Sequence, residues 1–188
     1  MPQSDGVRSL CLFCGSSNAA DPDFLQAAAE FGRLLAEAGV KLVYGGGGIG
    51  LMGAAAKATH AAGGQVLGVM PGFLRRREVL YDEVETVVVQ NMHERKTLMY
   101  DAADAYVVMP GGVGTLEEIV ELLSWRRLEL HTKPIVFVNL KGFWTPFFQL
   151  IDHTVEQRFT PDWVPTTYRS VDRVEDILPA LQNWPEAA

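Results

Sequence analysis

Apolar and polar positions follow two different patterns along this chain. Short, almost continuously apolar runs alternate with longer stretches in which apolar residues recur every three or four positions. A continuous apolar run predicts a strand buried on both faces, and the longer period predicts an amphipathic helix. The predicted strands are residues 9–14, 41–45, 66–70, 84–89, 105–109 and 134–140. The predicted helices are residues 22–38, 51–62, 93–103, 115–130 and 145–158, with a short one near 174–182.

Strand and helix alternate without a linker, a repeat or a low-complexity segment. Such alternation with fully apolar strands predicts a parallel sheet flanked by helices on both faces. We therefore expect an α/β fold, a single Rossmann-like domain over residues 1–188. The tail from Thr160 is expected to close over the same domain as a flap.

Unusual loops follow several of the predicted strands. In parallel sheets, ligands bind at the carboxyl ends of the strands, near a switch in strand order. Five polar or glycine-rich loops should meet at this edge: residues 14–18, 45–53, 70–73, 91–96 and 110–115.

The segment PGGVGTLEE, residues 110–118, combines a glycine-rich turn with a helix start. Free backbone N–H groups and the helix dipole favour a bound phosphate there. A structural alternative is a capping box between Thr115 and Glu118, which leaves the glycines unexplained. Helical geometry turns Glu117 about 100° away from Glu118, toward solvent.

The glycine run GGGGIGLMG, residues 45–53, fits G-x-G-x-x-G twice. A dinucleotide site also needs an acidic residue after the next strand, but VLGVM ends in Pro71, which disfavours NAD and FAD. Two interpretations stay open for individual glycines: close packing of a helix, or close approach of backbone to a ligand.

Arg95 and Lys96 stand at a predicted helix start, where positive charge opposes the helix dipole. Residues that break a local rule are candidates for function. The alternative is a surface pair compensated by Glu94. No metal site is visible, because His93 and Glu94 lack the second histidine of a zinc helix.

Two further features favour structural interpretations. Cys11 and Cys14 are spaced as C-x-x-C, but within a strand they point to opposite faces, which disfavours a redox pair. Arg75, Arg76 and Arg77 are typical of a solvated run.

Composition narrows the class of partner. The net charge of −7 argues against nucleic acid and anionic membranes. With 48% hydrophobic and 21% charged residues, the chain has a globular balance. The N-terminal residues contain no apolar leader segment, so we expect a cytoplasmic protein.

In this order, CGSS, the glycine run, MHERK and PGGVGTLEE resemble the LOG (Lonely Guy) family of cytokinin riboside 5′-monophosphate phosphoribohydrolases. The resemblance covers roughly Leu10 to Phe159 and includes WRRLELHTKPIVFVNLKGFW, residues 125–144. At 157–159 the chain has Gln-Arg-Phe where the family commonly has Glu-Gly-Phe, which leaves the base preference open.

The resemblance implies an activity and a set of site residues. Arg95 and Glu118 match the catalytic pair, which would cleave the N-glycosidic bond of purine riboside 5′-monophosphates without a cofactor. The phosphate would lie on the 111–115 backbone. The implied substrate-binding residues are Ser16, Ser17, Gly47, Gly48, Glu78, Lys96, Gly111, Gly112, Val113, Gly114, Thr115 and Glu117. The alternative is a non-catalytic nucleotide or molybdopterin carrier, which would not need the pair.

The helix from Thr115 also predicts an interface. We expect Leu116, Ile119, Val120 and Leu123 to face the sheet, and Leu122 and Trp125 to lie on a second apolar face. A homodimer would cover that second face, and the family resemblance also implies a dimer.

Overall fold

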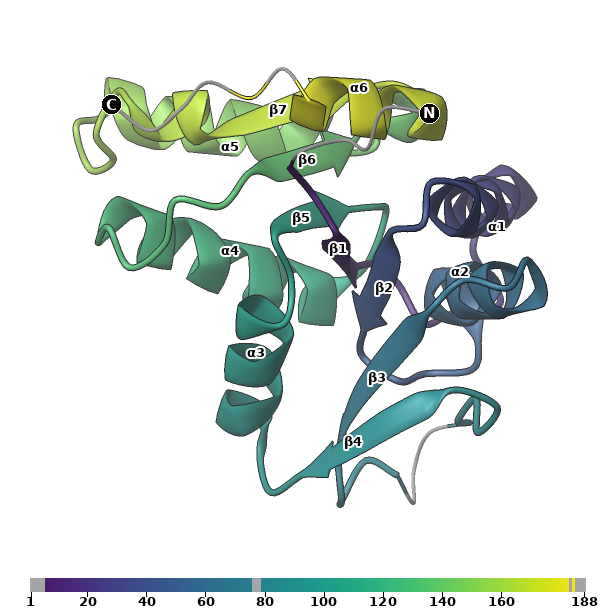
Figure 1. Ribbon diagram of the computed structural model, residues 1–188. Coiled ribbons are helices and arrows are strands. Elements are labelled where there is room, and N and C mark those ends of the chain that lie inside the picture. Colours follow the sequence, from purple (N-terminus) through teal and green to yellow (C-terminus); the bar gives the residue numbers. More distant parts are fainter. Residues whose placement is uncertain (1–5, 76–78, 183, 185–188) are drawn as a thin grey trace.

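A seven-stranded parallel sheet forms the centre of the molecule (Figure 1). The computed structural model describes residues 6–75, 79–182 and 184. Within them the strand order is β4-β3-β2-β1-β5-β6-β7, and every neighbouring pair is parallel. The strands are β1 (Ser9–Phe13), β2 (Lys41–Tyr44), β3 (Val66–Pro71), β4 (Glu85–Val89), β5 (Ala105–Val108), β6 (Ile135–Val138) and β7 (Tyr168–Val171).

Helices cover both faces of the sheet, as the fully apolar strands require. On one face lie α1 (Pro22–Glu37), α2 (Gly50–Ala61) and α6 (Ile177–Gln182). On the other lie α3 (Met92–Asp101), α4 (Val113–Arg127) and α5 (Thr145–Glu156). Short 3-10 turns are η1 (Leu140–Gly142), η2 (Val164–Thr167) and η3 (Val174–Asp176).

The alternation along β1 divides the core into two layers. Leu10 and Leu12 pack under α1 and α2, whereas Cys11 and Phe13 pack under α3 and α4. Cys14 belongs to the opposite layer from Cys11, and both thiols are free and buried. Burial raises the pKa of both thiols well above the ordinary value, so the structural interpretation of C-x-x-C is confirmed.

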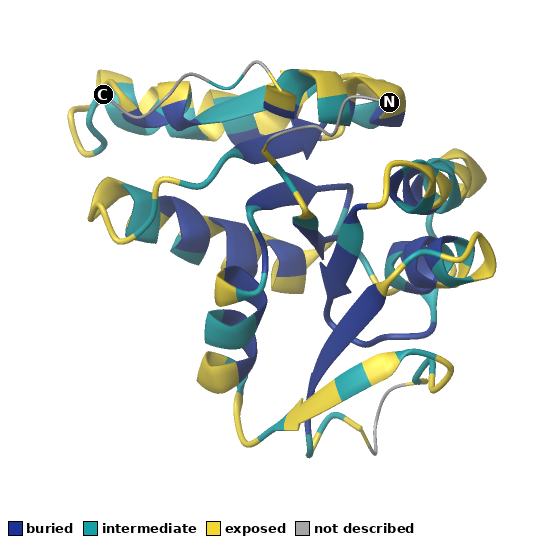
Figure 2. Cartoon of the chain, viewed as in Figure 1, coloured by how far each residue is buried: buried dark blue, intermediate teal, exposed yellow. Residues whose placement is uncertain are grey.

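The six predicted strands are confirmed, and β7 was missed. Its sequence, YRSV, has no continuous apolar run because it is an edge strand paired only with β6. The opposite edge, β4, is largely exposed, in contrast to the buried central strands (Figure 2). The tail from Thr160, expected to be a flap, instead extends the sheet with β7, and the short helix predicted near 174–182 is confirmed as α6.

The strand order reverses at β1, which lies between β2 and β5. From β1 the chain proceeds outward to β4, and then crosses back to β5 on the other side. The loops after β1 and β5 therefore diverge and leave a crevice between them, the usual place for a ligand in an open α/β sheet.

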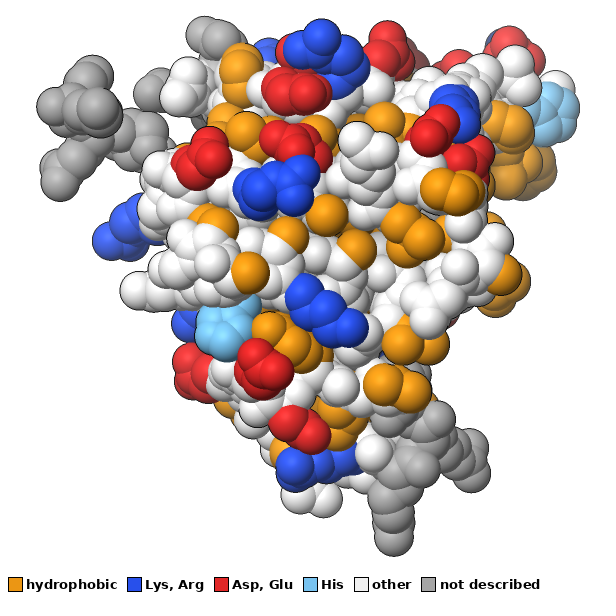
Figure 3. All heavy atoms as spheres, turned by 90° about the vertical axis from the view of Figure 1, so that its right-hand side faces the viewer, with side chains coloured by type: hydrophobic (Ala, Val, Ile, Leu, Met, Phe, Trp, Pro, Cys, Tyr) orange, Lys and Arg blue, Asp and Glu red, His pale blue; other side chains and the backbone are white. Residues whose placement is uncertain are grey.

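The surface over α1 and α2 carries charges of both signs with apolar side chains between them (Figure 3). None of the helices in the described ranges is long and apolar enough to cross a membrane.

Candidate active site

A cavity of about 370 Å³ opens at the reversal in strand order. Its walls are the loop after β1, the first turns of α2 and α3, and the first two turns of α4. The lining residues are Cys14, Gly15, Ser16, Ser17, Met52, Met92, Arg95, Gly112, Val113, Gly114, Thr115, Glu117 and Glu118.

The amino end of α4 faces this cavity without a side-chain cap. The helix begins at Val113 with Gly112 as its N-cap, and no side chain bonds to its first N–H groups. Thr115 is therefore the third helical residue, and the alternative interpretation as a capping box between Thr115 and Glu118 is wrong. The first-turn N–H groups of α4 stay available to an anion in the cavity.

Gly111 lies where the loop before α4 packs closely against the loop after β1. A Cβ atom at Gly111 would overlap the Thr115 hydroxyl and lie 2.9 Å from the backbone nitrogen of Gly15. That nitrogen donates to the carbonyl of Pro110 at 3.0 Å. Only glycine allows the β1 loop and the α4 loop to approach this closely.

Arg95 is buried, with 5% of its surface exposed. Its Nε donates to the Val69 carbonyl at 3.2 Å and its Nη2 to the Gly45 carbonyl at 3.1 Å. Glu94 does not pair with it but closes the cap of α3: the Glu94 backbone N–H donates to Asn91 at 2.9 Å, and its carboxylate accepts from the Gln90 N–H at 2.8 Å. The surface-pair interpretation is therefore wrong.

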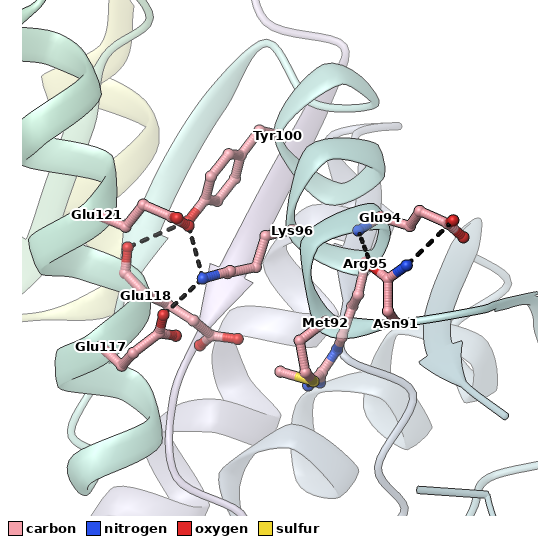
Figure 4. Close-up of polar contacts among 9 residues, drawn as sticks. All are labelled: Asn91, Met92, Glu94, Arg95, Lys96, Tyr100, Glu117, Glu118 and Glu121. Carbon is pink, nitrogen blue, oxygen red and sulfur yellow. Dashed lines mark hydrogen bonds and ion pairs between the residues drawn. The ribbon is translucent and has the colours of Figure 1, made fainter. Parts of the chain in front are cut away.

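Lys96, the next residue along α3, extends toward α4 and bridges the two helices (Figure 4). Its Nζ lies 2.5 Å from Glu117 and 2.8 Å from Glu121. Burial works to lower the pKa of Lys96, but these two carboxylates outweigh it and raise that pKa. Glu117, expected to be solvated, is exposed yet ion-paired, and it lines the cavity.

Glu118 is the buried carboxylate of the site, with 7% of its surface exposed. Figure 4 shows it pointing from α4 toward the side of α3 that carries Arg95. Among the residues that the structure describes, none donates a hydrogen bond to this carboxylate. Burial raises its pKa to about 7; Arg95 and Lys96 work against this rise, and Glu117 and Glu121 add to it. A carboxyl group that titrates near neutral pH suits general acid–base chemistry.

The glycine run serves close packing at several of its positions. Gly46 and Gly50 have φ angles of +83° and +63°. A Cβ atom at Gly48 would lie 2.6 Å from the Leu80 carbonyl oxygen. Gly47 pairs with Leu80, and the Gly48 N–H donates to the Val79 carbonyl at 2.7 Å. Gly47 and Gly48 therefore lie against the segment before β4 and do not line the cavity.

The structure gathers most of the predicted site residues around one cavity. It brings together Ser16, Ser17, Arg95, Gly112, Val113, Gly114, Thr115, Glu117 and Glu118. Lys96 and Gly111 lie directly behind the lining, and Glu78, Arg76 and Arg77 lie outside the described residues.

Sequence reasoning missed Met52 and Met92, which line the cavity from the first turns of α2 and α3. The available signal was that Met52 and Met92 lie within the unusual segments 45–53 and 91–96. Among the described residues, no group of three or more His, Cys, Asp or Glu side chains could hold a metal ion.

The sequence matches a known family and several known proteins. The sequence pattern of a family described as "possible lysine decarboxylase" matches residues 52–181. The cytokinin riboside 5′-monophosphate phosphoribohydrolase LOG of Oryza sativa subsp. japonica is 41% identical over 183 residues, covering 93% of this chain and 76% of that protein. A cytokinin riboside 5′-monophosphate phosphoribohydrolase of Arabidopsis thaliana is 36% identical over 178 residues, covering 94% and 82%.

Among solved structures, the molybdenum cofactor carrier protein from Chlamydomonas reinhardtii has a similar fold. The TM-score is 0.70 and the sequence identity 22%, with 93% of this chain and 95% of that chain covered. At this identity the likeness concerns the fold alone.

Proposed function

This chain belongs to the LOG family of cytokinin riboside 5′-monophosphate phosphoribohydrolases, and on that premise we propose that it hydrolyses purine riboside 5′-monophosphates to the free base and ribose 5-phosphate. Adenine nucleotides with an N6-isoprenoid group are the favoured substrates, following the names of the relatives. The proposal places the reaction in the cytoplasm, where nucleoside monophosphates are made and used.

One observation carries this proposal: an anion-binding helix end and a buried carboxylate share one cavity. Thr115 and Glu118 are one turn apart on α4, about 4.5 Å along the helix axis. A ribose can bridge such a distance. A phosphate on the first turn of α4 would therefore hold the sugar carbon of the glycosidic bond beside Glu118.

Glu118 would act on the sugar. Breaking the bond between C1′ and the base nitrogen leaves positive charge on the ribose, which a carboxylate stabilises. Water adds its hydroxyl group to C1′, and Glu118 takes up the water proton and relays it to the base. The electron pair of the broken bond goes to the base nitrogen, so atoms and charges balance. A pKa of about 7 allows Glu118 both to accept and to return the proton.

Arg95 would act on the leaving base. Its planar, cationic guanidinium group is held at the cavity wall by two backbone carbonyls. There it can stabilise negative charge that develops on the purine as the bond breaks. Met52 and Met92 offer polarisable apolar surface to the flat base.

A non-catalytic carrier is the second candidate, because a molybdenum cofactor carrier shares the fold. A carrier needs the anion-binding loop but not a buried, unbonded carboxylate across from a buried arginine. The presence of both Arg95 and Glu118 in one cavity therefore favours the enzyme.

Chromatographic measurement of released base tests the proposal. AMP and isopentenyl-AMP should yield free base and ribose 5-phosphate, and the corresponding nucleosides should react at least about 100-fold more slowly, because the phosphate supplies binding energy used for positioning. Equal rates for nucleosides would contradict the phosphate site. Tight AMP binding without base release would favour the carrier.

We also propose a homodimer formed through α4. Val113, Leu116 and Val120 are 83%, 37% and 50% exposed, and they share a helix face turned away from the fully buried Leu122. A helix that is apolar on both faces favours a second covering layer, which a second copy of the chain supplies.

A further inference from the structure

We propose that Gly45 is a positioning residue for Arg95: its missing side chain creates the slot in which the guanidinium group lies, and its carbonyl group orients that guanidinium toward the cavity. The catalytic significance of this slot rests on the function proposed above, whereas the slot itself is a matter of packing.

The slot lies between the carboxyl ends of two paired strands. β2 and β3 run in register with Tyr44 beside Gly68, so the next residues, Gly45 and Val69, are neighbours. Arg95 donates from Nη2 to the Gly45 carbonyl at 3.1 Å and from Nε to the Val69 carbonyl at 3.2 Å. Two hydrogen bonds on one side of a planar group fix both its place and its plane.

A side chain at position 45 would occupy the same space as the guanidinium group. A Cβ atom built on Gly45 would overlap Nη2 of Arg95, lie 3.1 Å from its Cζ, and lie 3.4 Å from the sulfur of Met52. Alanine at this position therefore cannot coexist with Arg95 in its present orientation.

The backbone of Gly45 does not itself require glycine. Gly46 and Gly50 have positive φ angles. A Cβ atom at Gly48 would meet the backbone of Leu80, and one at Gly53 would meet the backbone of Gly48. Gly45 has no positive φ, and the nearest atoms to its Cβ position belong to side chains, those of Arg95 first. At position 45, the space that the Arg95 side chain occupies is therefore the reason for a glycine.

The slot leaves one side of the guanidinium for the substrate. Nη1 lies 3.9 Å from the sulfur of Met92, which lines the cavity with Arg95. Because the donors are already fixed, no reorganisation is needed when the base departs. Displacing the group by about 1 Å can cost on the order of 100-fold in rate.

Arg95 also acts on Glu118, which supplies a readout without substrate. Arg95 works to lower the pKa of Glu118, so displacing the guanidinium should raise that pKa further. The charged and titratable groups that face Glu118 are Arg95, Lys96 and Tyr100 on α3, Glu117 and Glu121 on α4, Cys11 of β1, and Cys14 directly after β1. Of these, only Arg95 contacts Gly45.

The test is a double-mutant cycle of Gly45→Ala and Arg95→Ala. We expect Gly45→Ala to lower kcat for AMP about 100-fold and the double variant to be no slower than Arg95→Ala alone. NMR titration of carbon-labelled glutamate should show the Glu118 pKa raised in both single variants. Gly72→Ala is the control, because its Cβ would meet only ordinary contacts from 3.7 Å, and it should keep wild-type kcat and Glu118 titration.

Thermal unfolding of the same variants separates packing from activity. If Arg95 fills the slot, Gly45→Ala should lower Tm more in the wild-type background than in Arg95→Ala, where the overlap is gone. Equal losses in both backgrounds, or an unchanged kcat and Glu118 pKa in Gly45→Ala, would overturn the inference. A wild type that releases no base would refute the proposed function, while the Tm cycle and the titration would still decide the slot.

Discussion

Glu118 combines two properties that oppose each other. It is buried, which disfavours its charged form, and the proposed reaction needs that charged form. With no hydrogen bond to its carboxylate from any residue in the described ranges, burial governs its titration and raises its pKa to about 7. Function and stability should therefore respond to pH in opposite directions at this one residue.

The activity should need the charged form of Glu118. We expect kcat/KM to rise with pH and level off above about 7, because protonation below this value removes the carboxylate. Glu118→Gln should lower kcat by about 10²–10⁴-fold while AMP still binds. Single-turnover base release beside an AMP binding titration checks this. Normal turnover by Glu118→Gln would exclude a catalytic role for its charge.

The folded state should be more stable when Glu118 is neutral than when it is charged. The folded protein holds the Glu118 proton up to about pH 7, whereas the unfolded chain releases it near the ordinary value of 4.5. The cost of burying the charge of Glu118 is therefore absent below pH 4.5, grows as pH rises toward 7, and stays constant above. Removing it in Glu118→Gln should raise the free energy of unfolding by up to about 3 kcal/mol at pH 8.

Urea unfolding of both proteins at pH 4.5 and pH 8 checks this difference. A stabilisation that is the same at both pH values would contradict a raised pKa for Glu118.

The pair α3 and α4 holds the charges of the site. Lys96 from α3 forms ion pairs with both Glu117 and Glu121 of α4, which flank Glu118, while Tyr100 donates to the Glu118 backbone carbonyl at 3.2 Å. These contacts join two helices that are separated in sequence by β5. Lys96, which the family resemblance implies to be a substrate contact, is placed by the structure among carboxylates behind the cavity lining.

Lys96→Met distinguishes these two roles. Removing the ammonium group leaves three carboxylates on neighbouring turns of α4, so the pKa of Glu118 should rise and the acidic limb of the kcat/KM profile should move to higher pH. Activity should be recovered at alkaline pH. Lys141→Met, which removes an exposed lysine paired with Asp21 and Asp23, should leave the profile unchanged. A loss that is equal at all pH values would favour direct contact with the substrate.

The proposed dimer depends on how α4 is turned. Of the stripe expected to face the sheet, Ile119 and Leu123 are buried as predicted, but Leu116 and Val120 are exposed. Leu122, expected on the second face, is fully buried. Trp125 packs against Tyr100 of the same chain, with ring centroids 5.1 Å apart. A substitution at Trp125 would disturb the fold, so the exposed Val120 is the appropriate probe of a dimer interface.

Val120→Glu should convert a dimer to a monomer in light scattering, because a carboxylate on that face would be buried without a partner. Val88→Glu, at a comparably exposed position on the edge strand β4, should leave the dimer intact. A wild type that is monomeric at micromolar concentration would contradict the proposed dimer.

Local pattern was sufficient for the order of the elements and for the loops that bear the chemistry. Strand and helix periods are short-range properties, so β1 to β6, α1 to α6 and the converging loops could be predicted from the residues alone. The proposal that the end of α4 binds an anion followed from glycines that no cap explains. The strand β7 could not be predicted in this way, because it lies at the edge of the sheet and has no continuous apolar run.

Long-range contacts were needed for everything that depends on which side chains meet. Apolar residues all around α4 leave its rotation undetermined until it packs on the sheet, which buries Glu118 and Leu122 and exposes Val120. The partners of Lys96 come from another helix, and the slot for Arg95 comes from two strands far away in sequence. Burial and charge pairing, which set the pKa of Glu118, arise only when these distant segments come together.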